Sequence, residues 1–302
     1  MSLTFKPTSY LRPKTEEELS DLLKNFGERA KIIAGGTGIY EVAHRGLLAE
    51  IDVLIDISGL DLSYVSVESE SLKIGATTTM SAMARSSELG SRWQFCGIFD
   101  ALTAIQPLQV KNVATIGGAI CTALPFFDLP VSLLSLDAAV RIGPSNSRKK
   151  LSEFLLGYFV AALEQGEFVE EIELTLASNR ASAFQKFGLT HDDWALINCG
   201  VSLSLDGSRI VGPVIVFGGG VGERPVRAKA VEEALSGSDA GDEARVKAIF
   251  SENVPKDVET VADIRASAEY RLQLVKVLGA RTVFQASKRV QEARSGSKPW
   301  KR

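Results

Sequence analysis

Two short glycine-rich segments carry the residue types best suited to bind a phosphate. The first reads AGGTGI over Ala34–Ile39, and the second reads ATIGGAI over Ala114–Ile120. Each follows an apolar run that predicts a strand, Lys31–Ile33 and Val113–Thr115. Consecutive residues with little or no side chain let backbone N–H groups close on an anionic oxygen. Two such segments in one chain therefore predict a site for a diphosphate, as in a dinucleotide cofactor.

Neither segment matches the common nucleotide-binding motifs. The sequence has no G-x-G-x-x-G after the first strand and no G-x-x-x-x-G-K-[ST], which argues against a Rossmann domain and a P-loop NTPase. The alternative for either segment is a tight strand-to-helix turn in which glycine only supplies a positive φ. A third glycine run, Gly218–Gly222, lies between an apolar and a polar segment and is expected to be a loop after a strand.

Composition narrows the class of protein. The chain has 302 residues, 45% of them apolar and 24% charged, which is enough to bury a sizeable core in two domains. A net charge of −3 offers no basic face for nucleic acid. No apolar run reaches the ~18 residues of a membrane span, and the N-terminal segment lacks the apolar core of a signal peptide, so a cytoplasmic protein is expected.

Metal binding within this chain is not expected. Cys96, Cys121 and Cys199 are far apart in the sequence, and their odd number provides no disulfide framework. His44 and His191 are the two histidines, and neither has a second histidine or a cysteine at ligand spacing. We therefore assign no metal ligand and no catalytic acid or base.

Periodicity and turn signals predict an α+β protein in two domains. The first domain covers 1–177, with subdomains of about 1–59 and 60–177. A second domain covers 178–294, with antiparallel strands and helices, and a flexible tail that contains Trp300 covers 295–302. The expected strands are Lys31–Ala34, Val53–Ile57, Leu62–Ser69, Leu72–Ala76, Ala138–Ile142, Phe168–Leu174, Ala195–Leu205 and Arg209–Phe217. The last two are expected to form a hairpin with its turn at Asp206–Arg209. The expected helices are Leu19–Phe26, a helix from the first glycine turn to about Arg45, Ser81–Leu89, Pro130–Leu136, Ala228–Leu235, Asp242–Ser251 and Asp263–Arg294. A capping-box pattern at Thr15–Glu18 predicts the start of the first of these helices.

The order of motifs along the chain resembles a known family. AGGTGI, QVKNVATIGGAI, LPFFDLP and LLSLDAAV are followed by FQKFG, DDWALINCGVSL, FGGGVGERPVRAKAVEEAL and DIRASAEYRLQLVKVL. This series is similar to the FAD-binding medium subunit of the molybdenum hydroxylases, the xanthine dehydrogenase and carbon monoxide dehydrogenase family. The resemblance spans nearly the whole chain. It implies the FAD-binding fold of the vanillyl-alcohol oxidase (PCMH) type with two subdomains, followed by a C-terminal α+β domain with an antiparallel sheet and helices.

The resemblance also implies which residues surround FAD. Both glycine segments would wrap the diphosphate, Asp128 would accept hydrogen bonds from sugar hydroxyls, and Trp194 would lie near the flavin ring. For Asp128 the alternative is a helix cap, and for Trp194 it is a core position. The chain departs from the family at Gly38 and Ala119, where polar side chains are common. The implied cofactor-binding residues are Ile33, Ala34, Gly35, Gly36, Thr37, Gly38, Ile39, Ala114, Thr115, Ile116, Gly117, Gly118, Ala119, Cys121, Asp128, Lys186, Asp193 and Trp194.

The function implied by the resemblance is electron transfer within an assembly. A large molybdopterin subunit would hydroxylate the substrate, a small subunit with two iron-sulfur clusters would relay electrons, and FAD in this chain would pass them to an acceptor. The expected assembly is a dimerised heterotrimer, with NAD, quinone and oxygen all open as the acceptor. Two alternatives stay open: a stand-alone FAD-dependent oxidase of the same fold, and a non-enzymatic protein with a vestigial flavin site.

Overall fold

The computed structural model describes residues 5–299, so Trp300 and the end of the predicted tail lie outside the described residues. The N-terminal part is a small parallel sheet with strand order β1-β3-β2. Helix α1 begins where the hydroxyl of Thr15 accepts the N–H of Glu18, and it ends at Gly27, which has a φ of +55°. The elements of this part are β1 (Ser9–Leu11), α1 (Glu16–Phe26), the 3-10 helix η1 (Gly27–Arg29), β2 (Ala30–Ile33), α2 (Thr37–His44) and β3 (Val53–Asp56).

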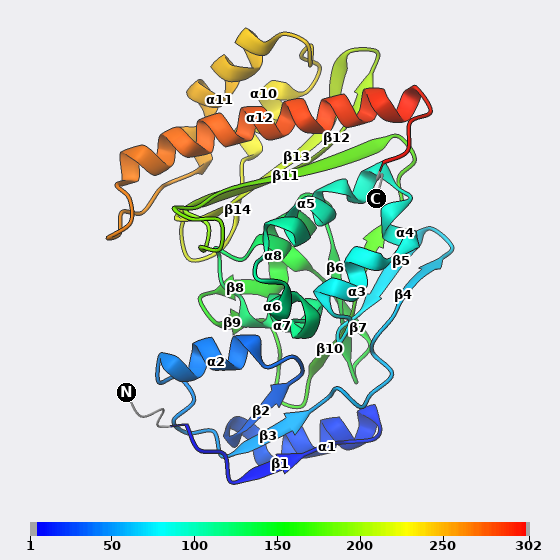
Figure 1. Ribbon diagram of the computed structural model, residues 1–302, viewed down its shortest axis with the longest axis vertical. Coiled ribbons are helices and arrows are strands. Elements are labelled where there is room, and N and C mark those ends of the chain that lie inside the picture. Colours follow the sequence, from blue (N-terminus) through cyan, green and yellow to red (C-terminus); the bar gives the residue numbers. More distant parts are fainter. Residues whose placement is uncertain (1–4, 300–302) are drawn as a thin grey trace.

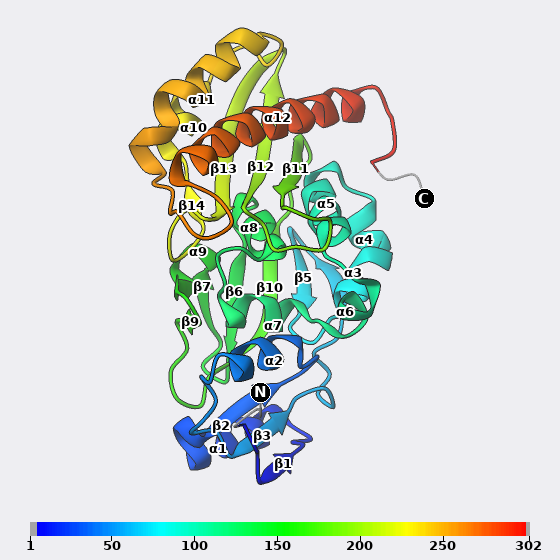
Figure 2. The ribbon, with the colours of Figure 1, turned by 60° about the vertical axis from the view of Figure 1, so that its left-hand side comes forward.

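The middle part is a five-stranded antiparallel sheet with strand order β4-β5-β10-β6-β7. Its inner face shares one apolar core with the helices of this part, as the residues Ile74, Val140 and Ile172 illustrate. Figures 1 and 2 show this layer between the N-terminal sheet and the C-terminal domain. The elements are β4 (Val65–Glu68), β5 (Ser71–Gly75), α3 (Met80–Arg85), α4 (Ser87–Gly90), the 3-10 helix η2 (Trp93–Phe95), α5 (Cys96–Ala104), α6 (Leu108–Val113), α7 (Ile116–Thr122), α8 (Asp128–Ser135), β6 (Ala139–Gly143), β7 (Ser147–Lys150), α9 (Leu151–Phe154), β8 (Leu155–Gly157), β9 (Val160–Ala161) and β10 (Phe168–Thr175).

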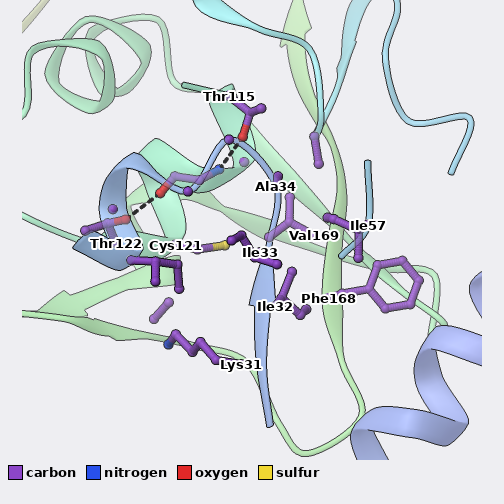
Figure 3. Close-up of a pocket in the computed structure, with 18 of the residues that line it drawn as sticks. Lys31, Ile32, Ile33, Ala34, Ile57, Thr115, Cys121, Thr122, Phe168 and Val169 are labelled. Atoms are coloured by element: carbon purple, nitrogen blue, oxygen red, sulfur yellow. Dashed lines mark hydrogen bonds between the residues drawn. The ribbon is translucent and has the colours of Figure 1, made fainter. Parts of the chain in front are cut away.

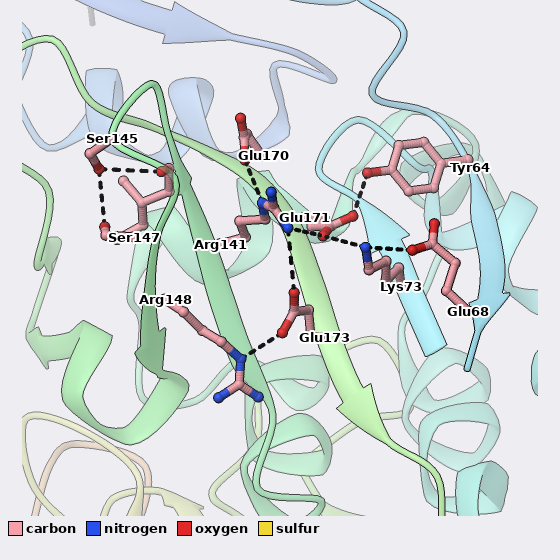
Figure 4. Close-up of polar contacts among 11 residues, drawn as sticks. Tyr64, Glu68, Lys73, Arg141, Ser145, Ser147, Arg148, Glu170, Glu171 and Glu173 are labelled. Carbon is pink, nitrogen blue, oxygen red and sulfur yellow. Dashed lines mark hydrogen bonds and ion pairs between the residues drawn. The ribbon is translucent and has the colours of Figure 1, made fainter. Parts of the chain in front are cut away.

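The other face of the middle sheet is lined by cross-strand polar contacts (Figure 4). The guanidinium of Arg148 meets the carboxylate of Glu173 at 2.6 Å, and the hydroxyl of Tyr64 donates to Glu171 at the same distance. Burial and the neighbouring carboxylate of Glu171 both raise the pKa of Tyr64, so its hydroxyl remains a donor. Two further ion pairs join strands that are adjacent in the sheet, Lys73 of β5 with Glu68 of β4 and Arg141 of β6 with Glu170 of β10. Opposite charges on adjacent strands stabilise the pairing and leave this face polar.

The C-terminal part is an antiparallel sheet with strand order β11-β12-β13-β14. The predicted hairpin is confirmed, because Asp206 pairs with Arg209 across a turn in which Gly207 has a φ of +58°. Long helix α12 crosses this sheet (Figure 1), and α5 and α8 of the middle layer pack against β11 to β13. The elements are β11 (Arg180–Phe187), β12 (Ile197–Asp206), β13 (Arg209–Gly219), β14 (Val226–Arg227), α10 (Lys229–Leu235), α11 (Glu243–Asp257) and α12 (Ala268–Arg294).

A largely buried ion pair joins the middle layer to α12. The carboxylate of Asp100 on α5 meets both terminal nitrogens of Arg289, at 2.5 and 2.8 Å. The same carboxylate accepts the backbone N–H of Phe184 on β11 at 3.0 Å. Beyond α12, the carbonyl of Ser297 accepts the indole N–H of Trp93 at 3.3 Å. The two layers are therefore held together by polar contacts as well as by apolar packing.

Several predicted boundaries differ from the structure. The strand expected at Val113–Thr115 is wrong, because Val113 is the last residue of helix α6 and only Ala114 and Thr115 are extended. The predicted helix from Asp263 begins instead at Ala268, where the hydroxyl of Ser267 caps its first turn. Strand β13 extends through Gly219, so the glycine run expected to be a loop starts inside the strand.

Candidate functional site

The first glycine segment forms a sharp turn from strand β2 into helix α2. Gly36 occupies the N-cap position with a φ of +74°, a conformation that favours glycine. The first backbone N–H groups of α2, those of Thr37, Gly38 and Ile39, have no hydrogen-bond partner within residues 5–299. Unpaired N–H groups and the positive end of the helix dipole attract an anion here.

The second segment also starts a helix, α7, but its amide groups are already used. The N–H of Ile116 donates to the carbonyl of Thr78 at 3.1 Å, and that of Gly117 donates to Ala76 at 2.9 Å. The N–H of Gly118 donates to the hydroxyl of Thr115 at 3.1 Å. The expectation that both segments offer free amide groups therefore holds for the first and is wrong for the second. The second segment contributes a glycine surface and the hydroxyl of Thr115.

Glycines let the first segment approach the residues that flank the second, and they let the second segment approach Ala76, which follows β5. A Cβ on Gly35 would overlap the backbone carbonyl of Val113, and a Cβ on Gly38 would lie 2.5 Å from the hydroxyl of Thr122. A Cβ on Gly117 would lie 2.7 Å from the carbonyl oxygen of Ala76. These positions require glycine because backbone or a tightly held side chain occupies the space of a side chain.

A cavity of about 340 Å³ lies on one side of the contact between the segments (Figure 3). We call it the aliphatic cavity, since β2, α2 and β10 line it mainly with apolar side chains. Figure 3 shows Ile33, Ile57 and Phe168 around it, with Lys31 at its edge. Its size is within the range of small-ligand pockets.

A second cavity of about 240 Å³ lies on the other side of the same contact. We call it the aromatic cavity, since Phe126, Phe127 and Trp194 line it. The ring of Trp194 stacks on that of Phe126 with centroids 4.7 Å apart, and the guanidinium of Arg45 lies 5.9 Å from the ring centroid of Trp194. Trp194 is 39% exposed, so the alternative of a core tryptophan is wrong. Both cavities share five lining residues, which we call the waist: Thr37, Gly38, Thr115, Gly118 and Thr122.

Asp128 lies at the wall of the aromatic cavity and is 6% exposed. One of its oxygens accepts from Lys186 Nζ at 3.0 Å and the other from the side-chain amide of Asn198 at 2.8 Å. Burial raises the pKa of Asp128 above its usual range, while the ammonium of Lys186 opposes the shift. The side chain caps no helix, because α8 begins at Asp128 itself with Phe127 as its N-cap.

The structure brings the implied residues together with one exception. Of the residues implied by the resemblance, all but Ile116 line one or both cavities, whereas Ile116 is fully buried. Sequence reasoning missed Thr122 and Phe126, although both lie within a few residues of the implied positions. Phe159 on the β8–β9 turn was also missed, and its place in the aliphatic cavity depends on tertiary contacts alone.

Neither a reactive thiol in the aliphatic cavity nor a metal-binding cluster is found among residues 5–299. Burial raises the pKa of Cys121 in the aliphatic cavity to about 12, so its thiol is not a nucleophile at neutral pH. Within residues 5–299 no group of three or more His, Cys, Asp or Glu side chains is placed to hold a metal ion. No helix among these residues is long and apolar enough to cross a membrane.

Comparisons with known proteins agree with this geometry. Residues 4–175 match the FAD binding domain in molybdopterin dehydrogenase, and residues 182–286 match the CO dehydrogenase flavoprotein C-terminal domain. The chain is 29% identical to the glyceraldehyde dehydrogenase medium chain of Sulfolobus acidocaldarius, over 89% of this chain and 95% of that relative. It is 27% identical to the carbon monoxide dehydrogenase medium chain of Afipia carboxidovorans, over 93% of this chain and 96% of that one.

Solved structures have the same fold. A chain of carbon monoxide dehydrogenase from Hydrogenophaga pseudoflava superposes with a TM-score of 0.86 at 27% identity, covering 94% of this chain and 98% of that one. The residues present also suit FAD, because unpaired amides for an anion lie between two cavities large enough for organic groups. The chain belongs to the family of FAD-binding subunits of the molybdopterin dehydrogenases.

Proposed function

We propose that this chain is the electron-transferring flavin subunit of a molybdenum-containing hydroxylase or dehydrogenase. Its cofactor is FAD, and bound FAD would supply a redox centre that accepts electrons from an iron-sulfur partner and donates them to an external acceptor. The observation that carries the proposal is the waist, where the free N–H groups of α2 lie between two cavities of different character. A dinucleotide needs this arrangement, with one site for its diphosphate and one for each of its two ends.

The waist is the proposed diphosphate site. The N–H groups of Thr37, Gly38 and Ile39 would donate to the phosphate oxygens, supported by the dipole of α2. The hydroxyl of Thr115 accepts from Gly118 and keeps its own proton to donate. Among residues 5–299 no lysine or arginine side chain lines both cavities, so dipoles and neutral donors would balance most of the negative charge.

The two ends of FAD are assigned by the character of the cavities. We place the flavin ring in the aromatic cavity, because a planar π system packs well against Trp194 and the two phenylalanines. Lys186 lines the same cavity and brings a positive charge to it. The adenosine would then occupy the aliphatic cavity, between Ile33, Ile57 and Phe168. In this arrangement the flavin lies beside the C-terminal domain.

Asp128 and Lys186 would set the polarity of the flavin end. Their ion pair keeps a carboxylate and an ammonium in place at a largely buried wall. Each oxygen of Asp128 already accepts one hydrogen bond, and its remaining lone pairs could accept a sugar hydroxyl. Lys186 has a further N–H to offer, since its other contact is the carbonyl of Ala104 at 3.4 Å.

The partners in this proposal are a large molybdopterin subunit and a small iron-sulfur subunit. Several relatives carry the words medium chain or medium subunit in their names, which supports a place in a multi-subunit enzyme. A stand-alone oxidase of the same fold is the second candidate. The names of these relatives favour the subunit.

Metal analysis of the native complex tests the proposal without knowledge of the substrate. The chain would be tagged in its own host, purified under native conditions, and analysed for flavin, molybdenum and iron. We expect molybdenum and iron to co-purify with FAD, and removal of the tagged chain by a chaotrope to leave both metals with the other subunits. A yellow, metal-free monomer that oxidises a substrate by itself would overturn the proposal in favour of the oxidase.

A further inference from the structure

Thr122 combines three features that no other residue of the waist combines. It is the last residue of α7, it borders both cavities, and its hydroxyl lies against the first turn of α2. Figure 3 shows the side chain beside the glycine turn, joined by a hydrogen bond to the backbone of α7. The contact links two segments that are 84 positions apart in the sequence, at Gly38 and Thr122.

The position of this hydroxyl is fixed. Its proton is donated to the carbonyl of Gly118 at 2.7 Å, one turn earlier in the helix. Such bonds are ordinary for threonine in helices and select its side-chain rotamer. In that rotamer the hydroxyl oxygen lies 2.5 Å from the place of a Cβ on Gly38. It therefore fills the space that a side chain at position 38 would need.

We propose that Thr122 is a cofactor-positioning residue whose hydroxyl oxygen accepts a hydrogen bond from a sugar-alcohol hydroxyl of FAD next to the diphosphate, and that it restricts position 38 to glycine. The inference rests on the proposed function. It assigns to α7 an acceptor that the glycine motifs alone do not supply, and it explains why the chain has no side chain at position 38.

The chemistry of the ligand group follows from the donor and acceptor count. A hydroxyl has one proton and two lone pairs, and the proton of Thr122 is already committed to Gly118. A further partner must therefore be a donor. Ionised phosphate oxygens cannot donate, whereas ribityl and ribose hydroxyls can. The other waist hydroxyls, those of Thr37 and Thr115, have their protons available for phosphate oxygens. Thr37 and Thr115 would therefore donate to the phosphates, and Thr122 would accept from a sugar hydroxyl.

Substitutions at Thr122 test the positioning role. Thr122→Val keeps the shape and removes the hydroxyl, while Thr122→Ser keeps the hydroxyl and serves as the matched control. We expect Thr122→Val to weaken FAD binding about three- to tenfold, as for one neutral hydrogen bond. Thr122→Ser should bind like the wild type. Titration of each apoprotein with FAD gives the dissociation constant, and the melting temperature without FAD reports on the fold.

The outcomes separate the inference from the proposed function. If the wild-type apoprotein binds no FAD, the proposed function fails. If the wild type binds FAD and Thr122→Val binds equally well, only the role of Thr122 is overturned. If Thr122 had a purely structural role, Thr122→Val and Thr122→Ser would both lower the melting temperature of the apoprotein, and Thr122→Ser would not retain the wild-type affinity for FAD. That result would also overturn the inference.

A swap of side chains tests the restriction on position 38. Gly38→Ser alone places its Cβ against the hydroxyl of Thr122 and should weaken FAD binding at least tenfold. The double variant Gly38→Ser, Thr122→Ala removes the clash and restores a hydroxyl from the other segment, so it should bind FAD more tightly than Gly38→Ser. If the losses of FAD affinity caused by the two substitutions were additive in the double variant, positions 38 and 122 would not compete for the same space, and the restriction on position 38 would be refuted.

Discussion

Gly118 allows the cofactor site to be perturbed with little effect on the core. The residue is exposed to the cavities, and a Cβ there would meet one neighbour, the hydroxyl of Thr115 at 3.0 Å. Gly118→Val would project two methyl groups into the waist where the diphosphate is proposed to lie. Gly117 is the matched control, because its Cβ would lie 2.7 Å from the backbone oxygen of Ala76, away from the waist.

The expected magnitude follows from ligand linkage. With FAD at a hundred times its dissociation constant, binding stabilises the folded chain by about 2.7 kcal/mol. For a domain of roughly 150–250 residues, each kcal/mol shifts the melting temperature by about 2–4 °C. The wild type should therefore melt roughly 5–10 °C higher with FAD than without it. Gly118→Val should lose this shift and should melt close to the wild-type apoprotein.

Thermal melts with and without FAD, together with isothermal titration, measure both quantities. Gly117→Val should lower the melting temperature of the apoprotein, because its side chain would displace backbone of the middle sheet. If Gly118→Val kept the full FAD-induced shift, the diphosphate would not lie at the waist. Gly36→Val is a weaker test, since Gly36 has a φ of +74° and valine there strains the backbone whether or not FAD is bound.

Three further predictions concern other parts of the chain. Trp194→Ala should raise the fluorescence of bound FAD and weaken its binding by about 1 kcal/mol. It should lower the free energy of unfolding by less than the roughly 3–5 kcal/mol expected for a core tryptophan. Unchanged fluorescence of bound FAD would show that Trp194 does not contact the flavin. Burial opposes ionisation of Asp263, but hydrogen bonds from neighbouring backbone and from Arg271 lower the pKa of Asp263 to about 2. The pKa of Asp263 is lower in the folded chain than in the unfolded chain, so Asp263→Asn should destabilise the chain at neutral pH. The difference in free energy of unfolding from the wild type should shrink as the pH falls from about 4 towards 2. Urea titrations at several pH values measure this difference. Asp100→Ala should cost about 3–5 kcal/mol, because it leaves the largely buried Arg289 without its carboxylate partner. Glu243→Ala, at the exposed ion pair with Lys247, should cost less than about 1 kcal/mol. Equal losses in chemical denaturation would contradict this.

Local pattern was sufficient for much of the fold. The strands over Leu72–Ala76, Ala138–Ile142 and Phe168–Leu174 alternate or concentrate apolar residues, and the sheet has strands at each of these places. Thr15 and Glu18 correctly predicted the start of α1, since a helix cap depends on residues that are close in the sequence. The turn residues around Gly207 correctly predicted the hairpin for the same reason. Signals of this kind are contained within about ten residues.

The misread features depend on segments that are distant in the sequence. The apolar residues before Thr115 are compatible with a strand or a helix, and the packing of α6 on α3 selects the helix. The amides of Ile116 and Gly117 are occupied by carbonyls about 40 positions earlier, which the glycine motif does not reveal. Thr122 was missed because its contact with Gly38 exists only after the two segments meet.

The central claim, that one FAD spans both cavities across the waist, is tested most directly by comparing FAD with FMN in titrations of the apoprotein. The account predicts one FAD per chain, complete release on acid precipitation, and much weaker binding of FMN, because FMN lacks the second phosphate and the adenosine proposed for the aliphatic cavity. Equal affinities for FAD and FMN would contradict the account, and so would flavin that stays with the precipitated protein.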